Sequence, residues 1–256
     1  MRDAATLPLL LKQLRLPSMY ANWEKLANQA QEESWSYTKY LASLSELEVT
    51  ARYNKRVQRH TKESKLPPGK TLATFNFKQA KSINKAMVEA LAEDASWVKK
   101  SENLVIFGPS GVGKTHLAAA IGYSMIEQGI RVLFSSTTAL VQKLQLARNE
   151  FKLPEAINKI GHYPLIILDD IGYVKKDEHE SSVLFDLIAD RYENSSIIVT
   201  ANQPFSEWDS IFPDNMMAVA AIDRLIHHAS IINIKEQSYR KATSANKKLN
   251  STAPCK

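Results

Sequence analysis

Residues 108–115 read GPSGVGKT. The stretch fits the pattern G-x-x-x-x-G-K-[ST], in which a glycine-rich turn directs backbone N–H groups at phosphate oxygens. Its glycines permit backbone angles that a side chain would forbid. We expect Lys114 to contact the outer phosphates of a nucleotide and Thr115 to supply a hydroxyl to Mg²⁺. The candidate nucleotide-binding residues are Gly108, Pro109, Ser110, Gly111, Val112, Gly113, Lys114, Thr115 and His116, although His116 also suits a purely structural role.

The flanking sequence has the order that this motif requires. Leu104 to Phe107 is a short apolar run typical of a buried strand, and the residues after Thr115 predict a helix whose positive end faces the phosphates. Further apolar strands are expected at 130–136, 163–172 and 195–202, with helices between them. Alternating strands and helices of this kind predict an α/β core with a parallel sheet covered on both faces.

Composition limits the classes of protein to consider. The chain has 256 residues, 44% hydrophobic and 23% charged, which is ordinary for a globular protein. No apolar run approaches the roughly 20 residues that span a bilayer, so we expect no membrane association. The N-terminal segment does not resemble a signal peptide. Cys255 is the sole cysteine, which excludes an intrachain disulfide and suits a reducing cytoplasm.

The net charge of +6 is distributed unevenly. Residues 1–70 hold 12 Lys and Arg against 7 Asp and Glu, residues 71–234 hold 15 against 19, and residues 235–256 hold 6 against 1. Basic ends on a slightly acidic core indicate either a polyanionic partner, most simply nucleic acid, or a solvated surface.

The first 65 residues predict a small helical domain. Leucines at 7, 10, 11 and 14 have helical spacing, Pro17 ends that pattern, and two further apolar faces follow. The third helix is expected to continue through a face that carries four cations, Arg52, Lys55, Arg56 and Arg59. Their mutual repulsion would be relieved by a DNA backbone or by acidic groups of another subunit.

We therefore expect four segments. Residues 1–65 are the helical domain, for DNA or partner binding and oligomerisation, and 66–101 are a linker and lead-in that begins with the turn-rich LPPGK. Residues 102–240 are the nucleotide-binding domain, and 241–256 a basic tail. Phe75 and Phe77 in the lead-in suit ordinary packing better than an adenine pocket.

Polar residues end two of the predicted strands. Asp169 ends LIILD and can hold Mg²⁺ opposite Thr115, while Asp170 can orient the attacking water or serve as a turn residue. Asn202 follows the next strand, where its amide can bond the γ-phosphate or the water, or form a simple turn.

Phosphoryl transfer often needs an additional cation. Arg224 is the first candidate and Arg191 the second, and either residue can instead form a structural salt bridge. His227 and His228 alone are weak evidence for a metal site.

Together the segments GPSGVGKTHLA, LIILDDIGY, IIVTANQPFSEW, IDRLIHHA and QSYR resemble, in order, the IstB family, the ATP-binding helpers of insertion sequences. That family is related to DnaC-type helicase loaders and DnaA-type initiators of the AAA+ class. The resemblance implies an AAA+ P-loop core and an ATPase that uses Mg²⁺, self-associates into an ATP-dependent multimer, binds and deforms duplex DNA and cooperates with the element's transposase. It makes 108–115 Walker A and Asp169–Asp170 Walker B. It also makes Asn202 sensor 1, Arg224 an arginine finger and Arg240 a possible C-terminal sensor.

Two features depart from the usual AAA+ pattern. Walker B ends in Asp170 instead of glutamate, one methylene shorter, which predicts slow hydrolysis. Only 54 residues follow Asn202, so the helical lid is expected to be reduced or absent. Besides a transposition helper, the sequence leaves open a helicase loader and a nucleotide-gated scaffold with negligible hydrolysis.

Overall fold

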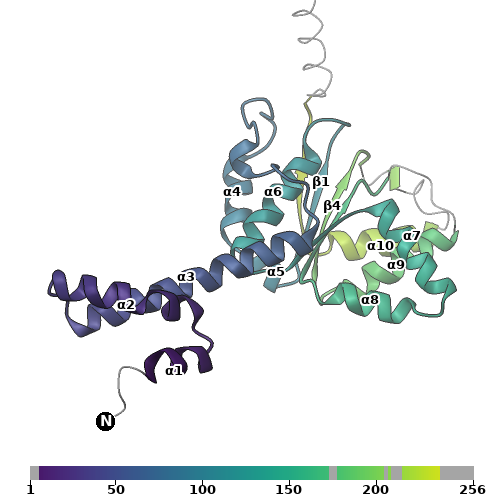
Figure 1. Cartoon of the computed structure of the whole chain (residues 1–256). Coiled ribbons are helices and arrows are strands. Elements are labelled where there is room, and N and C mark those ends of the chain that lie inside the picture. The colour runs from purple at the N-terminus through teal and green to yellow at the C-terminus, as the bar shows by residue number, and fades with distance from the viewer. Residues whose placement is uncertain (1–5, 173–177, 205–206, 209–214, 237–256) are drawn as a thin grey trace, which may run out of the picture. The chain divides into compact units, whose positions relative to one another are not determined.

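The computed structural model describes residues 6–172, 178–204, 207–208 and 215–236 (Figure 1). The chain forms two compact units, Met1–Arg59 and His60–Lys256. The division between them falls within a long helix, six residues before the boundary predicted from the sequence.

The N-terminal unit consists of helices, as predicted. They are α1 (Leu7–Gln13), α2 (Pro17–Glu32) and α3 (Tyr37–Ser64), the last of which continues into the second unit. Pro17 occupies the first turn of α2, where its missing N–H breaks no helical hydrogen bond. The same helix end is capped by buried Glu48 of α3, which accepts hydrogen bonds from the backbone N–H groups of Ser18 at 2.8 Å and Met19 at 3.2 Å.

The second unit is built on a parallel five-stranded sheet in the order β2-β3-β4-β1-β5. Its strands are β1 (Asn103–Phe107), β2 (Val132–Ser136), β3 (Leu165–Asp169), β4 (Ser196–Ala201) and β5 (Ala229–Asn233). The four strands predicted from the sequence are confirmed, and β5, which was not predicted, pairs with β1 at an edge. All five carboxyl ends therefore meet at one edge of the sheet.

Helices cover both faces of this sheet, with α4 and α6 on one side and α7 to α10 on the other (Figure 1). Alternate strand residues separate the two layers, because Ile166 and Leu168 join the cluster beneath α7, α9 and α10 while Ile167 faces α6. The helices are α4 (Lys85–Glu93), α5 (Ser96–Lys99), α6 (Lys114–Glu127), α7 (Thr137–Asn149), α8 (Leu153–Gly161), α9 (Glu178–Arg191) and α10 (Asn215–Ile226).

A close approach between α6 and β3 positions the start of α6. A Cβ added to Gly122 would lie 2.9 Å from Cδ1 of Ile167, so glycine at this position lets α6 pack closely on β3. The short loop 108–113 joins β1 to α6, so the N-terminus of α6 lies at the carboxyl end of β1, the edge at which ligands bind in open α/β sheets.

The described residues after Asn202 contribute α10 and β5 to the core, and no lid helix occurs among them. Residues 237–256, where Arg240 and the predicted tail fall, lie outside the described part of the chain. Within the described part, no helix combines the length and apolar character needed to cross a bilayer.

Candidate nucleotide-binding site

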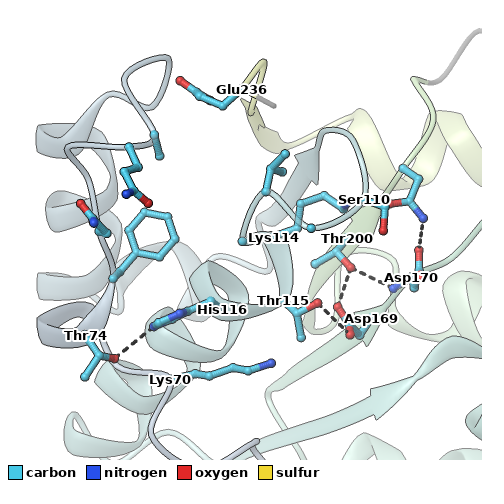
Figure 2. Close-up of a pocket in the computed structure, with 18 of the residues that line it drawn as sticks. Lys70, Thr74, Ser110, Lys114, Thr115, His116, Asp169, Asp170, Thr200 and Glu236 are labelled. Atoms are coloured by element: carbon cyan, nitrogen blue, oxygen red, sulfur yellow. Dashed lines mark hydrogen bonds between the residues drawn. The ribbon is translucent and has the colours of Figure 1, made fainter. Parts of the chain in front are cut away.

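A cavity of about 790 Å³ lies at the carboxyl edge of the sheet (Figure 2). One wall is the loop from Ser110 to Thr115, and the floor is formed by the ends of β3 and β4. The opposite wall comes from the lead-in segment 70–81 and from Glu236. The P-loop and the Walker B strand predicted from the sequence are thus brought together in one cavity.

Glycine is required at both ends of the phosphate-binding loop. Gly108 has φ 151°, and a Cβ there would lie 2.5 Å from the backbone oxygen of Ile234. Gly113 has φ 103° and occupies the N-cap of α6, where an added Cβ would lie 3.1 Å from the ring of Phe75. The loop therefore combines left-handed backbone with close approaches that no other residue type allows.

Lys114 is buried, with 7% of its surface exposed. Its ammonium donates to the carbonyl oxygens of Gly108 at 2.8 Å and Pro109 at 2.9 Å, and to Oδ1 of Asn202 at 2.6 Å. These contacts hold the charge inside the loop, next to the place where outer phosphates would sit.

Asp169 lies at the end of β3 between two hydroxyl groups. Thr115 donates to its Oδ2 at 3.1 Å, and Thr200 of β4 donates to its Oδ1 at 2.7 Å (Figure 2). A carboxylate and a P-loop hydroxyl side by side are the ligands that Mg²⁺ takes in such sites. The residues present therefore fit the ion that the motif implies.

Asp170 is held in a left-handed conformation, with φ 62°. Its backbone N–H donates to Oγ1 of Thr200 at 2.8 Å, and its Oδ1 accepts from Nδ2 of Asn202 at 2.7 Å. Asn202 consequently connects Asp170 to Lys114 through its two amide atoms. This amide network joins the three residues that the sequence assigned to catalysis at this edge of the sheet.

Two contributors to the site were missed by sequence reasoning. Thr200 bonds both Walker B aspartates, and its signal was a polar residue inside the apolar run SIIVTA, two places before Asn202. Phe75, for which the sequence favours packing over an adenine pocket, lines the cavity and also makes edge contacts with the rings of Phe77 and His116. Because it is an aromatic wall, Phe75 is suited to contact a nucleobase.

His116 joins α6 to the lead-in segment. Its Nε2 lies 3.0 Å from the carbonyl oxygen of Thr71 and 3.1 Å from the hydroxyl of Thr74. Across the cavity, Glu236 accepts hydrogen bonds from the backbone N–H and hydroxyl of Ser82. Although burial raises the pKa of Glu236, these bonds outweigh it and hold the pKa below its usual value.

The two candidate arginines lie away from these phosphate-binding groups. Arg191 is 1% exposed and donates to the carbonyl oxygens of Tyr163 at 2.9 Å and Ser196 at 3.0 Å, at the amino ends of β3 and β4. Burial lowers its pKa to about 10, so it remains charged at neutral pH. The suggestion that Arg191 assists phosphoryl transfer is therefore corrected: the residue ties strands to α9.

Arg224 is half-buried on the last turn of α10, with its guanidinium over the ring of Phe185 at 5.0 Å. Its backbone oxygen faces Nδ2 of Asn103, the first residue of β1, whereas the P-loop follows the last residue of that strand. A five-residue strand spans roughly 13 Å, so the backbone of Arg224 and the P-loop of the same chain lie at opposite ends of β1.

In the N-terminal unit, the four predicted DNA-binding cations are all exposed on α3. Arg52, however, donates to Oε1 of Glu48 at 2.8 Å and to the carbonyl oxygen of Arg15 at 2.6 Å. The repulsion predicted for this face is thus partly relieved within the unit, and the cations left for a partner are Lys55, Arg56 and Arg59.

The chain is similar to known ATP-binding proteins. The family described as IstB-like ATP binding protein matches residues 9–247. A Sinorhizobium fredii protein named as an insertion sequence ATP-binding protein is 50% identical over 242 residues, which cover 94% of this chain and 81% of that protein. One from insertion sequence IS21 of Pseudomonas aeruginosa is 36% identical over 234 residues, 91% of this chain and 88% of that protein.

Solved structures show the same fold. The DnaC helicase loader superposes with a TM-score of 0.55 at 24% identity, over 66% of this chain and 98% of that chain. DnaA from Aquifex aeolicus, bound to AMPPCP, gives 0.56 at 20% identity, over 73% of this chain and 57% of that chain. The core has the AAA+ P-loop fold, and because the family match spans nearly the whole sequence, the chain belongs to the IstB-like ATP-binding proteins of insertion sequences.

Proposed function

We propose that this protein is an ATP-dependent helper of DNA transposition. It hydrolyses ATP at the described cavity, assembles into a multimer on duplex DNA, remodels that DNA and recruits the transposase of its element. The observation that carries the ATPase part is the amide of Asn202, which bonds both Lys114 and Asp170. The names of the relatives support the link to insertion sequences and to ATP.

In this proposal each residue of the site has a separate task. Lys114 neutralises the outer phosphates, and Thr115 and Asp169 hold Mg²⁺, which supplies further positive charge to the phosphoryl oxygens. Asp170 orients the attacking water, and Asn202 positions both that carboxylate and the γ-phosphate. The short Asp170 side chain, already bonded to Asn202, supports slow turnover in the absence of DNA.

Arg224 is proposed to act on the ATP of a neighbouring subunit. Its place at the amino end of the strands supports this role, because the P-loop of the same chain follows the opposite end of β1. A cation supplied in trans makes hydrolysis depend on assembly. ATP would then be hydrolysed only where two subunits are in contact.

We further propose that α3 carries the DNA contacts through Lys55, Arg56 and Arg59. All three are exposed, and they are spaced along about one turn of the helix, which suits contact with successive phosphates. Such contacts carry no base information, so the binding they provide is largely independent of sequence and falls steeply with salt. Cations distributed over a multimer can offset the few kcal/mol that bending a site costs.

The DNA assignment is tested by charge reversal. The double variant Arg56→Glu, Arg59→Glu should weaken duplex binding by at least ~10-fold and flatten its salt dependence, since each phosphate contact contributes to the salt slope. The matched control is Lys12→Glu, Lys25→Glu, which makes the same change of charge at exposed positions of α1 and α2. Both variants should bind ATP as the wild type does. Equal DNA affinity of the two variants would defeat the α3 assignment.

One alternative has an observation in its favour. The bonding of Asp170 to Asn202 also suits a scaffold that binds ATP to assemble and hydrolyses it negligibly. Phosphate release by the wild type and by Asp170→Ala, each with and without duplex DNA, separates the two. A DNA-stimulated rate that disappears in Asp170→Ala supports the ATPase, whereas identical rates support the scaffold.

A further inference from the structure

The turn that follows α10 carries two adjacent histidines, His227 and His228, and both are exposed. Glu193, just after α9, is exposed beside them. Among the residues that the structure describes, these three each offer a ligand atom, and the three atoms all lie within 4.8 Å of one another. The third ligand comes from a residue 34 positions earlier, so adjacency in the sequence does not explain the group.

The geometry points to a binding site for a divalent transition-metal ion, with Zn²⁺ as the representative, formed by Glu193, His227 and His228. Imidazole nitrogens and a carboxylate oxygen are a preferred ligand set for zinc, and a water molecule would complete four-fold coordination. Ligand atoms around a tetrahedral ion with bonds of about 2.0–2.1 Å lie roughly 3.4 Å apart. Rotation of exposed side chains closes the remaining distance, because such rotamers interconvert readily.

A neighbouring hydroxyl supports one histidine in the required orientation. The hydroxyl of Tyr192 lies 3.0 Å from Nδ1 of His227. An ion on Nε2 would fix the tautomer in which Nδ1–H donates to the tyrosine oxygen, the arrangement that commonly orients metal-bound histidines. The histidine rings themselves lie with centroids 4.1 Å apart. Tyr192 would therefore act as a positioning residue.

The backbone under the site is anchored. The backbone N–H of His227 donates to the carbonyl oxygen of Asp223 at 2.9 Å, and the carbonyl oxygen of His228 accepts from the backbone N–H of Asn103 at 2.8 Å. Asp223, exposed one helical turn before His227, adds a second carboxylate to this surface, which favours a cation there.

This site is separate from the proposed magnesium site. Asn103 begins β1 and the P-loop follows its end, so the two sites lie at opposite edges of the sheet. An ion held by Glu193 and the histidines would join the ends of α9 and α10. Arg224 lies three residues before His227, so the ion would also fix the turn on which that arginine sits.

The test uses untagged full-length protein, freed of metal with a chelator, and titrated with Zn²⁺ at pH 7.5 by calorimetry. The visible spectrum of Co²⁺ serves as a second probe, since tetrahedral coordination gives intense absorption. We expect one ion per chain, and at least ~10-fold weaker binding in Glu193→Gln, His227→Gln and His228→Gln, as each removes one ligand. His162→Gln, an exposed histidine after α8, is the matched control and should bind as the wild type does.

Three results of these titrations would contradict the proposed metal site. Saturation that survives all three substitutions would place the ion elsewhere, such as at Asp169, and would overturn the proposal. Absence of saturable binding in the wild type would do the same. Loss in the histidine variants but not in Glu193→Gln would contradict the three-ligand site.

Discussion

The ammonium of Lys114 and the side-chain oxygen of Asn202 lie 2.6 Å apart. The other end of the same amide donates to Asp170, so a residue of the P-loop and a residue of Walker B are linked through one side chain. An incoming γ-phosphate would compete with Asn202 for the lysine. The amide of Asn202 can therefore transmit the arrival of the γ-phosphate to Asp170, the carboxylate proposed to orient water.

Replacing Asn202 with alanine should separate binding from catalysis. We expect kcat for ATP hydrolysis to fall by roughly 10²-fold, the usual cost of losing one oriented hydrogen-bonding group in a phosphoryl or acyl transfer site. ATP affinity should change much less, because the P-loop amides and Lys114 remain. Phosphate-release kinetics and nucleotide titration measure the two effects. Asn158→Ala, at an exposed position of α8, is the control and should leave both unchanged.

Thr200 should be needed for the geometry of Walker B. Thr200→Val keeps the shape but removes the hydroxyl that bonds Asp169 at 2.7 Å and the N–H of Asp170 at 2.8 Å. The unpaired groups should cost about 1–3 kcal/mol of stability and raise the Mg²⁺ concentration needed for hydrolysis. Thr200→Ser retains the hydroxyl and should restore most of both properties. If the valine variant has a wild-type Mg²⁺ requirement, Thr200 does not orient Asp169.

Gly108 and Gly161 offer a matched pair of glycine substitutions. Gly108→Ala places a methyl group against the backbone oxygen of Ile234 and forces a positive φ, which should cost at least about 1–3 kcal/mol. Gly161, the last residue of α8, has no heavy atom within 4 Å of an added Cβ. Gly161→Ala should be neutral or stabilising by up to about 1 kcal/mol. Denaturant unfolding of both variants measures the two changes in stability. Equal losses of stability in the two variants would contradict the prediction.

Glu48 should make the N-terminal unit sensitive to acid. Burial raises the pKa of this carboxyl, but the hydrogen bonds from Arg52, Met19 and Ser18 outweigh it and hold the pKa below its usual value. A lowered folded-state pKa contributes stability above the unfolded pKa of about 4.3, and this contribution is lost as pH falls through the folded value.

Glu48→Gln should accordingly be less stable than the wild type at pH 7, by about 1–3 kcal/mol. The difference should shrink below pH ~4, where the wild-type carboxyl also becomes neutral. Urea unfolding at several pH values, followed by helical circular dichroism, measures it. A difference that stays constant between pH 7 and pH 3 would show that charge on Glu48 is irrelevant to this cap.

The sequence predicted the parts of the site that are local in the chain. Strand, P-loop and helix are contiguous, and Asp169 and Asn202 each end an apolar strand, so parallel pairing had to bring them to one edge. The edge strand β5 escaped prediction because its five residues are short and only partly buried. The sequence could not place Phe75 at the cavity, because an aromatic residue in a lead-in segment has the same local pattern whether it packs, lines a cavity or does both.

Arg191 shows a different limit. Its sequence neighbourhood resembles that of Arg224, yet the guanidinium is enclosed by strand-end carbonyl oxygens. Which edge of a sheet a helix end reaches depends on the three-dimensional packing of that helix, and charge alone does not reveal it. The contact of Arg52 with the carbonyl oxygen of Arg15 was hidden for the same reason, since it joins residues 37 positions apart.

Arg224 is proposed to complete the ATP site of a neighbouring subunit. Mixing two inactive variants tests whether the site is shared in this way. Lys114→Ala lacks a working P-loop but retains Arg224, and Arg224→Ala has the reverse defect. Arg148→Ala, an exposed arginine on α7, should remain active and serves as the control. Co-assembly is verified first, by light scattering with ATP and duplex DNA.

In mixed multimers some Arg224→Ala subunits lie beside partners that supply the missing arginine. We expect ATP hydrolysis, absent in either variant alone, to reappear on mixing and to be greatest near equal proportions. Co-assembled mixtures that stay inactive at every ratio would contradict a shared site.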